Sequence, residues 1–117
     1  MLPLVSMYRA AKAAANAVTE SLASEVAQFG VRVHLVLPGS SDETRFRETA
    51  YEYLKGTDDP VYGDFMKQTI ARMMASTGPG THARDVAEAV WKAATDPAAP
   101  LRIPAGADAV QWAAEAG

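Results

Sequence analysis

Tyr8 and Lys12 are the residues of this chain whose types and spacing could do chemistry. They form a Tyr-x-x-x-Lys pair, and residues four apart in a helix share one face. A phenol in water titrates near pH 10, and a cation held within about 4–6 Å favours its ionised form. We therefore expect Tyr8 to give or take a proton near neutral pH, as reduction of a carbonyl or oxidation of an alcohol requires.

A second pair with the same spacing, Tyr51 and Lys55, shows that this pattern alone is not specific. The two pairs differ in the sequence downstream of each. An apolar, β-branched run that ends at Pro38-Gly39 comes after the first pair, whereas no comparable run comes after the second. We therefore interpret the second pair as a solvated helix face and the first as the candidate site.

The elements that must position Tyr8 can be predicted from apolar spacing and from Gly and Pro. Apolar residues at spacings of three and four predict a helix over 8–28 that stops at Gly30. The run 31–37 predicts a short, buried, parallel strand. Further helices are expected over 44–55, over 60–75, from Thr81 or His82 to about Thr95, and over 108–116, with a second strand over 101–103.

The order helix, strand, long insert, helix, strand predicts an α/β fold with a parallel sheet. The 117 residues are enough for one domain, and we expect a single unit over 1–117 that is mostly helical. Two strands, however, make a poor sheet, because open edges and apolar faces stay uncovered. The pattern therefore predicts that partner structure is absent from the chain.

Composition and charge exclude several classes of function. A net charge of −3 without a basic cluster argues against nucleic acid or an anionic membrane surface as the main partner. The absence of cysteine excludes disulfides and thiolate metal sites, and neither His34 nor His82 stands in a ligand pattern, so no metal is expected. No run reaches the ~18 apolar residues of a membrane span, and the first residues do not read as a secretory signal. We expect a cytoplasmic protein.

Beyond the pair itself, longer stretches of the chain resemble the C-terminal half of the short-chain dehydrogenase/reductase family. The resemblance covers nearly the whole chain and lies in 8–14 (YRAAKAA), 20–22 (ESL), Glu25, 29–33 (FGVRV), 37–39 (LPG), 84–90 (RDVAEAV) and 101–109 (LRIPAGADA). It implies the C-terminal part of a Rossmann-like, doubly wound parallel sheet. It also implies an oxidoreductase that uses NAD or NADP and acts on a carbonyl or a secondary alcohol.

The resemblance assigns roles residue by residue. Tyr8 would be the general acid and base, and Lys12 would bind the nicotinamide ribose and activate Tyr8. Pro38 and Gly39 would lie beside the nicotinamide ring, and Thr44 is the candidate for the threonine that binds the carboxamide, although it falls one residue later than the family spacing. The insert 40–80 would be a substrate lid, with an apolar substrate suggested by residues that include Phe46, Tyr51, Phe65 and Met66.

Parts of the family pattern are missing from the sequence. Residues 1–7 alone precede Tyr8, so the Gly-rich turn that binds the dinucleotide is missing, as are the upstream Asn and catalytic Ser, a role that Ser6 stands too close to Tyr8 to take. We therefore expect a truncated enzyme that is inactive alone and pairs with a missing N-terminal half or forms a homo-oligomer.

Two other interpretations of the sequence stay open. One is a non-catalytic module that pairs through the small residues of helix 8–28, a helix through which members of the resembling family commonly dimerise. The other is a remnant without function.

Overall fold

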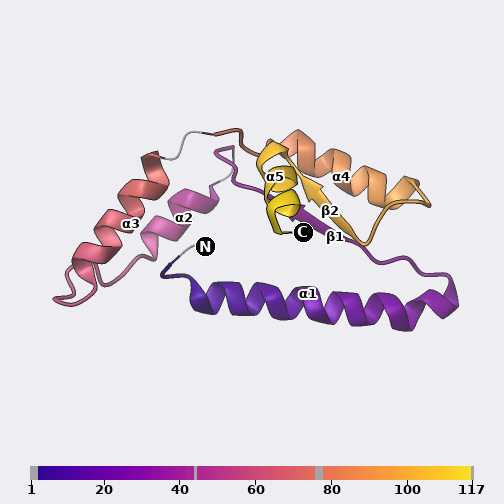
Figure 1. The fold of residues 1–117 in the computed structure, drawn as a ribbon, viewed down its shortest axis with the longest axis horizontal. Coiled ribbons are helices and arrows are strands. Elements are labelled where there is room, and N and C mark those ends of the chain that lie inside the picture. Colours follow the sequence, from indigo (N-terminus) through magenta and orange to yellow (C-terminus); the bar gives the residue numbers. More distant parts are fainter. Residues whose placement is uncertain (1–2, 44, 76–77, 117) are drawn as a thin grey trace.

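The computed structural model of the chain describes residues 3–43, 45–75 and 78–116. Over these ranges the chain forms five α-helices, one 3-10 helix and a two-stranded sheet. Figure 1 shows how the α-helices and strands are arranged. In chain order the elements are α1 (Ser6–Val26), η1 (Ala27–Phe29), β1 (Leu35–Pro38), α2 (Phe46–Glu52), α3 (Gly63–Ala75), α4 (Ala83–Thr95), β2 (Arg102–Ala105) and α5 (Ala107–Ala116).

The two strands are parallel, which confirms the predicted α/β arrangement. Leu35 is in register with Arg102, and Pro38 with Ala105. The predicted extent of the first strand was wrong, because the ladder begins at Leu35 rather than at Val31. Among the described residues β2 is the neighbour of β1, and it begins only at Arg102, so 31–34 have no strand to pair with.

The prediction that the first strand is buried was also wrong. Its residues from Leu35 to Leu37 are half-buried, and Pro38 is exposed. A parallel strand becomes buried when elements cover both of its faces and both of its edges. Here β1 has β2 on one edge and α4 against it, so part of the strand stays open to solvent.

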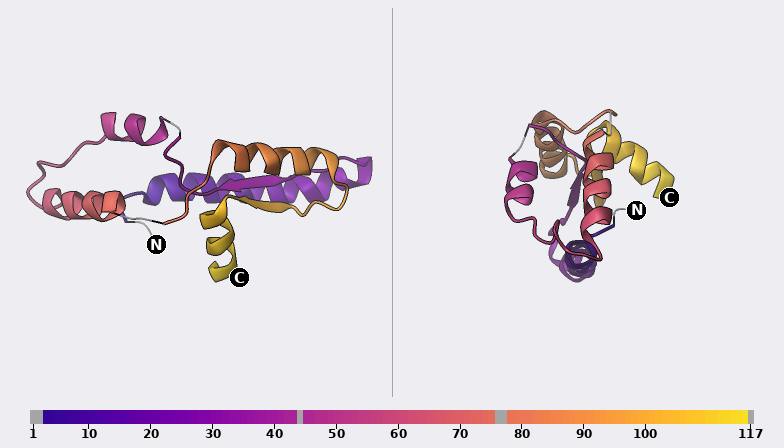
Figure 2. Two further views of the ribbon diagram at one scale, coloured as in Figure 1. Left: turned by 90° about the horizontal axis from the view of Figure 1, so that it is seen from above. Right: turned by 90° about the vertical axis from the view of Figure 1, so that its left-hand side faces the viewer.

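The small core lies where α4 packs on the sheet. Its buried members are Ala89, Ile103 and Ala105, and half-buried apolar side chains, Val36 among them, surround these three. Views from two directions place the sheet between α4 on one side and α1 on the other (Figures 1 and 2). The core therefore belongs to the strands and the C-terminal helices.

Helix α1 contributes no buried residue to the part of the chain that the structure describes. The predicted apolar stripe is present, but Val18 is 67% and Leu22 is 44% exposed. An ion pair between Glu20 and Arg102 connects the middle of α1 to β2. The helix ends as predicted, since Gly30 adopts a left-handed φ of 72° after η1.

The insert 40–80 forms two helices at one end of the molecule, away from the core (Figure 1). Both are shorter than predicted, because α2 ends at Glu52 and α3 begins at Gly63. At the start of α3 the Asp59 carboxylate accepts the N–H groups of Val61 and Tyr62, both at 2.8 Å. This side-chain turn holds 60–62 outside the helix.

The overall shape is elongated. The radius of gyration is 17.0 Å, whereas a compact domain of this length has about 13 Å. The extents are 55 × 27 × 27 Å. Within the described ranges, no helix combines the length and apolar character needed to cross a membrane.

Candidate active site

Helix α1 brings Tyr8 and Lys12 together on its first turns. The Lys12 ammonium lies over the Tyr8 ring, with 5.6 Å between Nζ and the ring centroid. This distance falls within the range of a cation–π contact. Both side chains are exposed, Tyr8 to 50%. The geometry therefore joins a phenol and a cation on a surface that a ligand can reach.

The other Tyr-x-x-x-Lys pair is not presented in this way. Helix α2 ends at Glu52, so Tyr51 lies in its last turn and Lys55 lies beyond it. The Leu54 N–H closes a turn onto the Tyr51 carbonyl at 3.1 Å, which bends the chain away from the helix. We expected both residues on one solvated helix face; Tyr51 and Lys55 are solvent-exposed, but they do not share a helix.

Pro38 and Gly39 lie where β1 ends, and a buried network holds the backbone at this point. The Gly39 N–H donates to Thr81 Oγ1 at 2.9 Å, and the Ser40 N–H donates to Asp108 Oδ2 at 2.7 Å. Thr81 Oγ1 lies 2.7 Å from Asp108 Oδ1 and 2.9 Å from the Ala105 carbonyl. We call Gly39, Ser40, Thr81, Ala105 and Asp108 the strand-end network.

The acidic member of this network is held in its ionised form. Burial of Asp108 by itself raises the pKa of its carboxyl group. Hydrogen bonds from the Thr81 hydroxyl and from the N–H groups of Ser40 and Ala109 outweigh that effect, so the pKa of Asp108 lies below its ordinary value. A carboxylate that accepts several N–H and O–H donors is a fixed anchor for the loop that provides them.

Two glycines leave the space in which this network forms. A Cβ on Gly39 would lie 2.1 Å from Asp108 Oδ1, and one on Gly106 would lie 1.9 Å from Thr81 Oγ1. Gly106 also has a φ of +105°, a conformation that side chains with a Cβ rarely adopt. Gly39 is therefore needed because any side chain at this position would collide with the Asp108 carboxylate.

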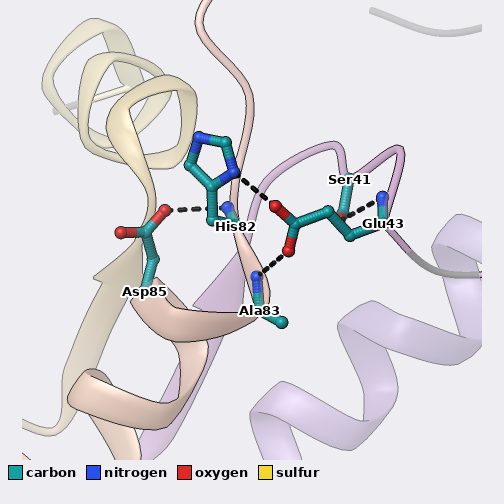
Figure 3. A network of polar contacts seen from close by, with 5 residues as sticks. All are labelled: Ser41, Glu43, His82, Ala83 and Asp85. Atoms are coloured by element: carbon teal, nitrogen blue, oxygen red, sulfur yellow. Dashed lines mark hydrogen bonds and ion pairs between the residues drawn. The ribbon is translucent and has the colours of Figure 1, made fainter.

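A second polar cluster joins the beginning of the insert to the start of α4 (Figure 3). The Glu43 carboxylate lies 2.6 Å from His82 Nδ1 and accepts the Ala83 N–H at 2.8 Å. The His82 N–H in turn donates to Asp85 Oδ2 at 2.8 Å, which confirms His82 as the residue that caps α4. We call Glu43, His82, Ala83 and Asp85 the insert clasp.

Contacts within the insert clasp shift the pKa values of Glu43 and His82, which are both exposed. Hydrogen bonds from the Ala83 N–H and from His82 lower the pKa of Glu43. The same Glu43 contact, with the charge of Asp85, raises the pKa of His82. The two groups are therefore charged together over a range of mildly acidic pH.

The remaining predicted site residues lie in the insert. Thr44 falls outside the described residues, and the side chain of Phe46 is likewise not described. Tyr51 and Phe65 are 40% and 45% exposed. Met66 is only 8% exposed and packs against the turn at Gly56. Exposed aromatic side chains thus occur on both α2 and α3.

Sequence reasoning missed the residues that hold this region together. Thr81 was considered only as a helix cap, and Asp108 only as the start of a closing helix. Their partners are 42 and 68 residues away in the chain, so no local spacing reveals them. The available signal was the Gly106-x-Asp108 pattern after a strand, which places a carboxylate beside a tight turn.

In the ranges that the structure covers, no group of three or more His, Asp or Glu side chains could hold a metal ion. The first turn of α1, the end of β1 and the insert lie toward the same end of the molecule (Figures 1 and 2). Chemistry at Tyr8 would thus take place at the end to which the insert belongs.

Comparison with known proteins agrees with this geometry. The family model for short chain dehydrogenase matches residues 1–54, which include Tyr8, Lys12, Pro38 and Gly39. Two uncharacterized oxidoreductases of Schizosaccharomyces pombe are each 29% identical to the chain over 113 residues. Each match covers 96% of this chain and 46% of the relative, so the chain spans about half the length of these curated relatives. No solved structure matches the chain.

The family match, the two relatives and the parallel αβ arrangement point in the same direction. They support the resemblance that the sequence showed. Over residues 1–54, and at 29% identity over 113 residues, the chain is thus similar to short-chain dehydrogenases and to two oxidoreductases.

Proposed function

We propose that this chain carries the proton-transfer site of an NAD(P)-dependent oxidoreductase that acts on a carbonyl or a secondary alcohol. The observation that carries the proposal is the Lys12 ammonium 5.6 Å from the ring centroid of the exposed Tyr8, inside the segment matched by the family model. A phenol beside a cation serves both directions of such a reaction, because it can give a proton to an alkoxide and take one from an alcohol.

The residues of the chain fit the nicotinamide end of a dinucleotide. Lys12 would hold the ribose, the Pro38–Gly39 backbone would lie beside the ring, and Thr44 would bind the carboxamide. A bound NAD or NADP supplies hydride transfer, and the protein supplies position and charge. The sequence holds no Gly-rich turn between a strand and a helix for the phosphates, so this part of the site would come from other structure.

The substrate would be covered by the insert. Tyr51 and Phe65 are large side chains exposed on α2 and α3, and Phe46 begins α2. Met66 would support this surface from within, since it is buried against the turn at Gly56. Such a surface favours a substrate with an apolar body around its carbonyl or hydroxyl group.

The test is replacement of Tyr8 by Phe, with Tyr51→Phe as the matched control. Tyr51 has the same Lys spacing and a similar exposure, 40% against 50%, but lacks the helical pairing. Loss of a general acid lowers turnover by about 10²–10⁴-fold. We expect that loss for Tyr8→Phe and unchanged turnover for Tyr51→Phe.

Carbonyl reduction should be assayed with NADH and NADPH in two forms of the protein. One form is the chain alone, and the other is the chain combined with the part of a fission yeast relative that the match leaves uncovered. Turnover in either form that survives Tyr8→Phe would reject Tyr8 as the acid. Equal loss in both variants would indicate damage to the fold.

A second candidate function, a helix-pairing module, is favoured by the surface of α1. This helix of 21 residues buries none of them among the described residues, and Val18 and Leu22 stay exposed. Light scattering of the wild type and of Val18→Glu distinguishes the two functions. A dimer that Val18→Glu dissociates, in a protein that binds no nucleotide, would support the module over the enzyme.

A further inference from the structure

The end of β1 is held by contacts to three residues, Thr81, Ala105 and Asp108. The Gly39 N–H reaches Thr81 Oγ1 at 2.9 Å and also lies 3.3 Å from the Ala105 carbonyl. The Ser40 N–H reaches Asp108 Oδ2, and the Ser40 carbonyl accepts the Thr81 N–H at 2.7 Å. The backbone groups of two successive loop residues are thus bound by partners from two other segments.

Hydrogen-bond accounting shows how the Thr81 hydroxyl acts in this network. A hydroxyl can donate one proton and accept others. Thr81 Oγ1 accepts the Gly39 N–H and has its own proton to give either to Asp108 Oδ1 at 2.7 Å or to the Ala105 carbonyl at 2.9 Å. When the proton goes to Asp108, which is the shorter of the two contacts, Thr81 links the position of Asp108 to the Gly39 backbone.

Burial makes these contacts consequential. Thr81 is 2% exposed and Asp108 is 6% exposed. A buried polar group that loses its partner keeps its desolvation cost, so the network favours one arrangement over all partly bonded ones. The missing Cβ atoms of Gly39 and Gly106 let the two side chains sit against the backbone.

From this geometry we infer that Thr81 and Asp108 are positioning residues that hold the Gly39–Ser40 backbone in place independently of the insert. The insert leaves the sheet at Ser40 and returns at Thr81, and the Thr81 N–H bond to the Ser40 carbonyl closes its two ends on each other. The contacts that hold Gly39 and Ser40 therefore come from Thr81, Ala105 and Asp108 and not from α2 or α3. The importance of this for a nicotinamide ring rests on the proposed function.

The first arm of the test measures amide hydrogen exchange by NMR on the chain itself. The amides of Gly39 and Ser40 report on the network, and the amide of Leu35, which donates to the Leu101 carbonyl at 2.7 Å, reports on the sheet. Thr81→Val removes the hydroxyl and keeps the shape, whereas Thr81→Ser keeps the hydroxyl. We expect at least ten-fold faster exchange at Gly39 in Thr81→Val, with Leu35 unchanged, and near wild-type protection in Thr81→Ser.

Two results of this arm would overturn the inference. One is protection of Gly39 in Thr81→Val equal to that in the wild type. The other is a matching loss at Leu35, which would make Thr81 a general stabiliser of the sheet. Asp108→Ala provides an independent variant, with faster exchange expected at Ser40.

The second arm measures NADH and NADPH binding to the same variants by cofactor fluorescence. Each variant is measured alone and combined with the part of the Schizosaccharomyces pombe relative that the match leaves uncovered. If the wild type binds, we expect about ten-fold weaker binding for Thr81→Val and near wild-type binding for Thr81→Ser. Equal binding by Thr81→Val would overturn the positioning role. A wild type that binds neither cofactor in both forms, together with the expected exchange pattern, would reject the proposed function and leave the backbone assignment supported.

Discussion

The two regions that would meet at an active site are built in opposite ways. At the strand-end network, Thr81 and Asp108 are buried, and they form hydrogen bonds to each other and to the Gly39 and Ser40 N–H groups. On α1, Tyr8 and Lys12 lie on an exposed surface, and the helix contributes nothing to the core of the described residues. The end of β1 is therefore fixed by this chain, whereas the position of Tyr8 depends on a helix with little local support.

Helix α1 is the part of the chain that depends on other structure for its support. A helix in water draws most of its stability from packing of an apolar face, and α1 has such a face without a covering element among the described residues. The radius of gyration of 17.0 Å, against about 13 Å for a compact domain, gives the same picture for the whole chain. Structure that covers α1 would also fix Tyr8.

The largest effect is expected from filling the space at the strand-end network. Gly106→Ala puts a Cβ 1.9 Å from Thr81 Oγ1 at a φ of +105°. We expect it to cost about 1–3 kcal/mol for backbone strain and about 1–3 kcal/mol for overpacking. Urea unfolding measures the sum.

Gly78→Ala is the matched control for this substitution. Nothing lies within 4 Å of a Cβ at Gly78, so we expect a change within about 0.5 kcal/mol. Similar unfolding midpoints for Gly106→Ala and Gly78→Ala would contradict the tight packing assigned to the network.

The charge of Asp108 gives the next largest effect. Asp108→Ala leaves the Ser40 N–H without its acceptor and should cost about 1–3 kcal/mol near neutral pH. Asp108→Asn keeps an acceptor oxygen and should cost less. Unfolding in urea at neutral pH orders the two variants, and a larger loss for Asn than for Ala would refute the acceptor role.

The same carboxylate predicts a dependence on pH. The pKa of Asp108 in the folded chain lies below its ordinary value of 3.8. Its stabilisation is therefore complete above 3.8 and is lost as the pH falls through the folded value. The difference in stability between wild type and Asp108→Asn should shrink below pH 3.8, and a difference that stays constant down to pH 2 would contradict the linkage.

The contrast between the two regions also marks the limit of prediction from sequence. Gly30, Pro38 and the parallel strand pair could be predicted because Gly, Pro and β-branched runs act through their immediate neighbours. Asp59 shortened α3 through a side-chain turn that the apolar pattern does not encode. The strand bounds depended on where a partner strand begins far along the chain.

The candidate site divides in the same way. Tyr8 and Lys12 were found because their spacing is local, and the structure places them together. Thr81, Glu43 and Asp108 were missed because the contacts that give them their roles join residues 24 to 68 positions apart. The roles proposed for Tyr8, Lys12, Pro38, Gly39 and Thr44 remain predictions.

A smaller effect is expected from the ion pair that links α1 to the sheet. Arg102 pairs with Glu20, at side-chain exposures of 57% and 35%. Exposed ion pairs contribute up to about 1 kcal/mol, so Arg102→Ala should leave overall stability nearly unchanged. Because this pair links α1 to the sheet, we expect faster amide exchange along α1, measured by mass spectrometry.

Arg84→Ala is the control for this ion pair. Arg84 pairs with Glu88 within α4, at 2.9 Å and with greater exposure. It should leave the exchange of α1 amides at the wild-type rate. Equal rates along α1 in both variants would show that the Glu20–Arg102 pair does not hold the helix.

The smallest expected effect concerns the insert clasp, which stands between the two regions in character. Like α1, the clasp is exposed to solvent. Like the strand-end network, it is held by several hydrogen bonds. The raised pKa of His82 gives stabilisation that is complete below its ordinary value of 6.5 and is lost as the pH rises through the folded value. The lowered pKa of Glu43 gives stabilisation that is complete above 4.5 and is lost as the pH falls. The clasp is therefore strongest between about pH 4.5 and 6.5.

Glu43→Gln tests this clasp by removing one charge while keeping an oxygen acceptor. The pKa of His82, followed by NMR titration, should fall toward its ordinary value, because the Glu43 contact is the largest cause of its rise. Part of the rise should remain, since the charge of Asp85 also acts on His82. Glu88→Gln, which lies on the same helix but pairs with Arg84, should leave the His82 titration unchanged. If both variants give the wild-type titration, Glu43 does not hold His82 in solution, and the strand-end network alone joins the ends of the insert.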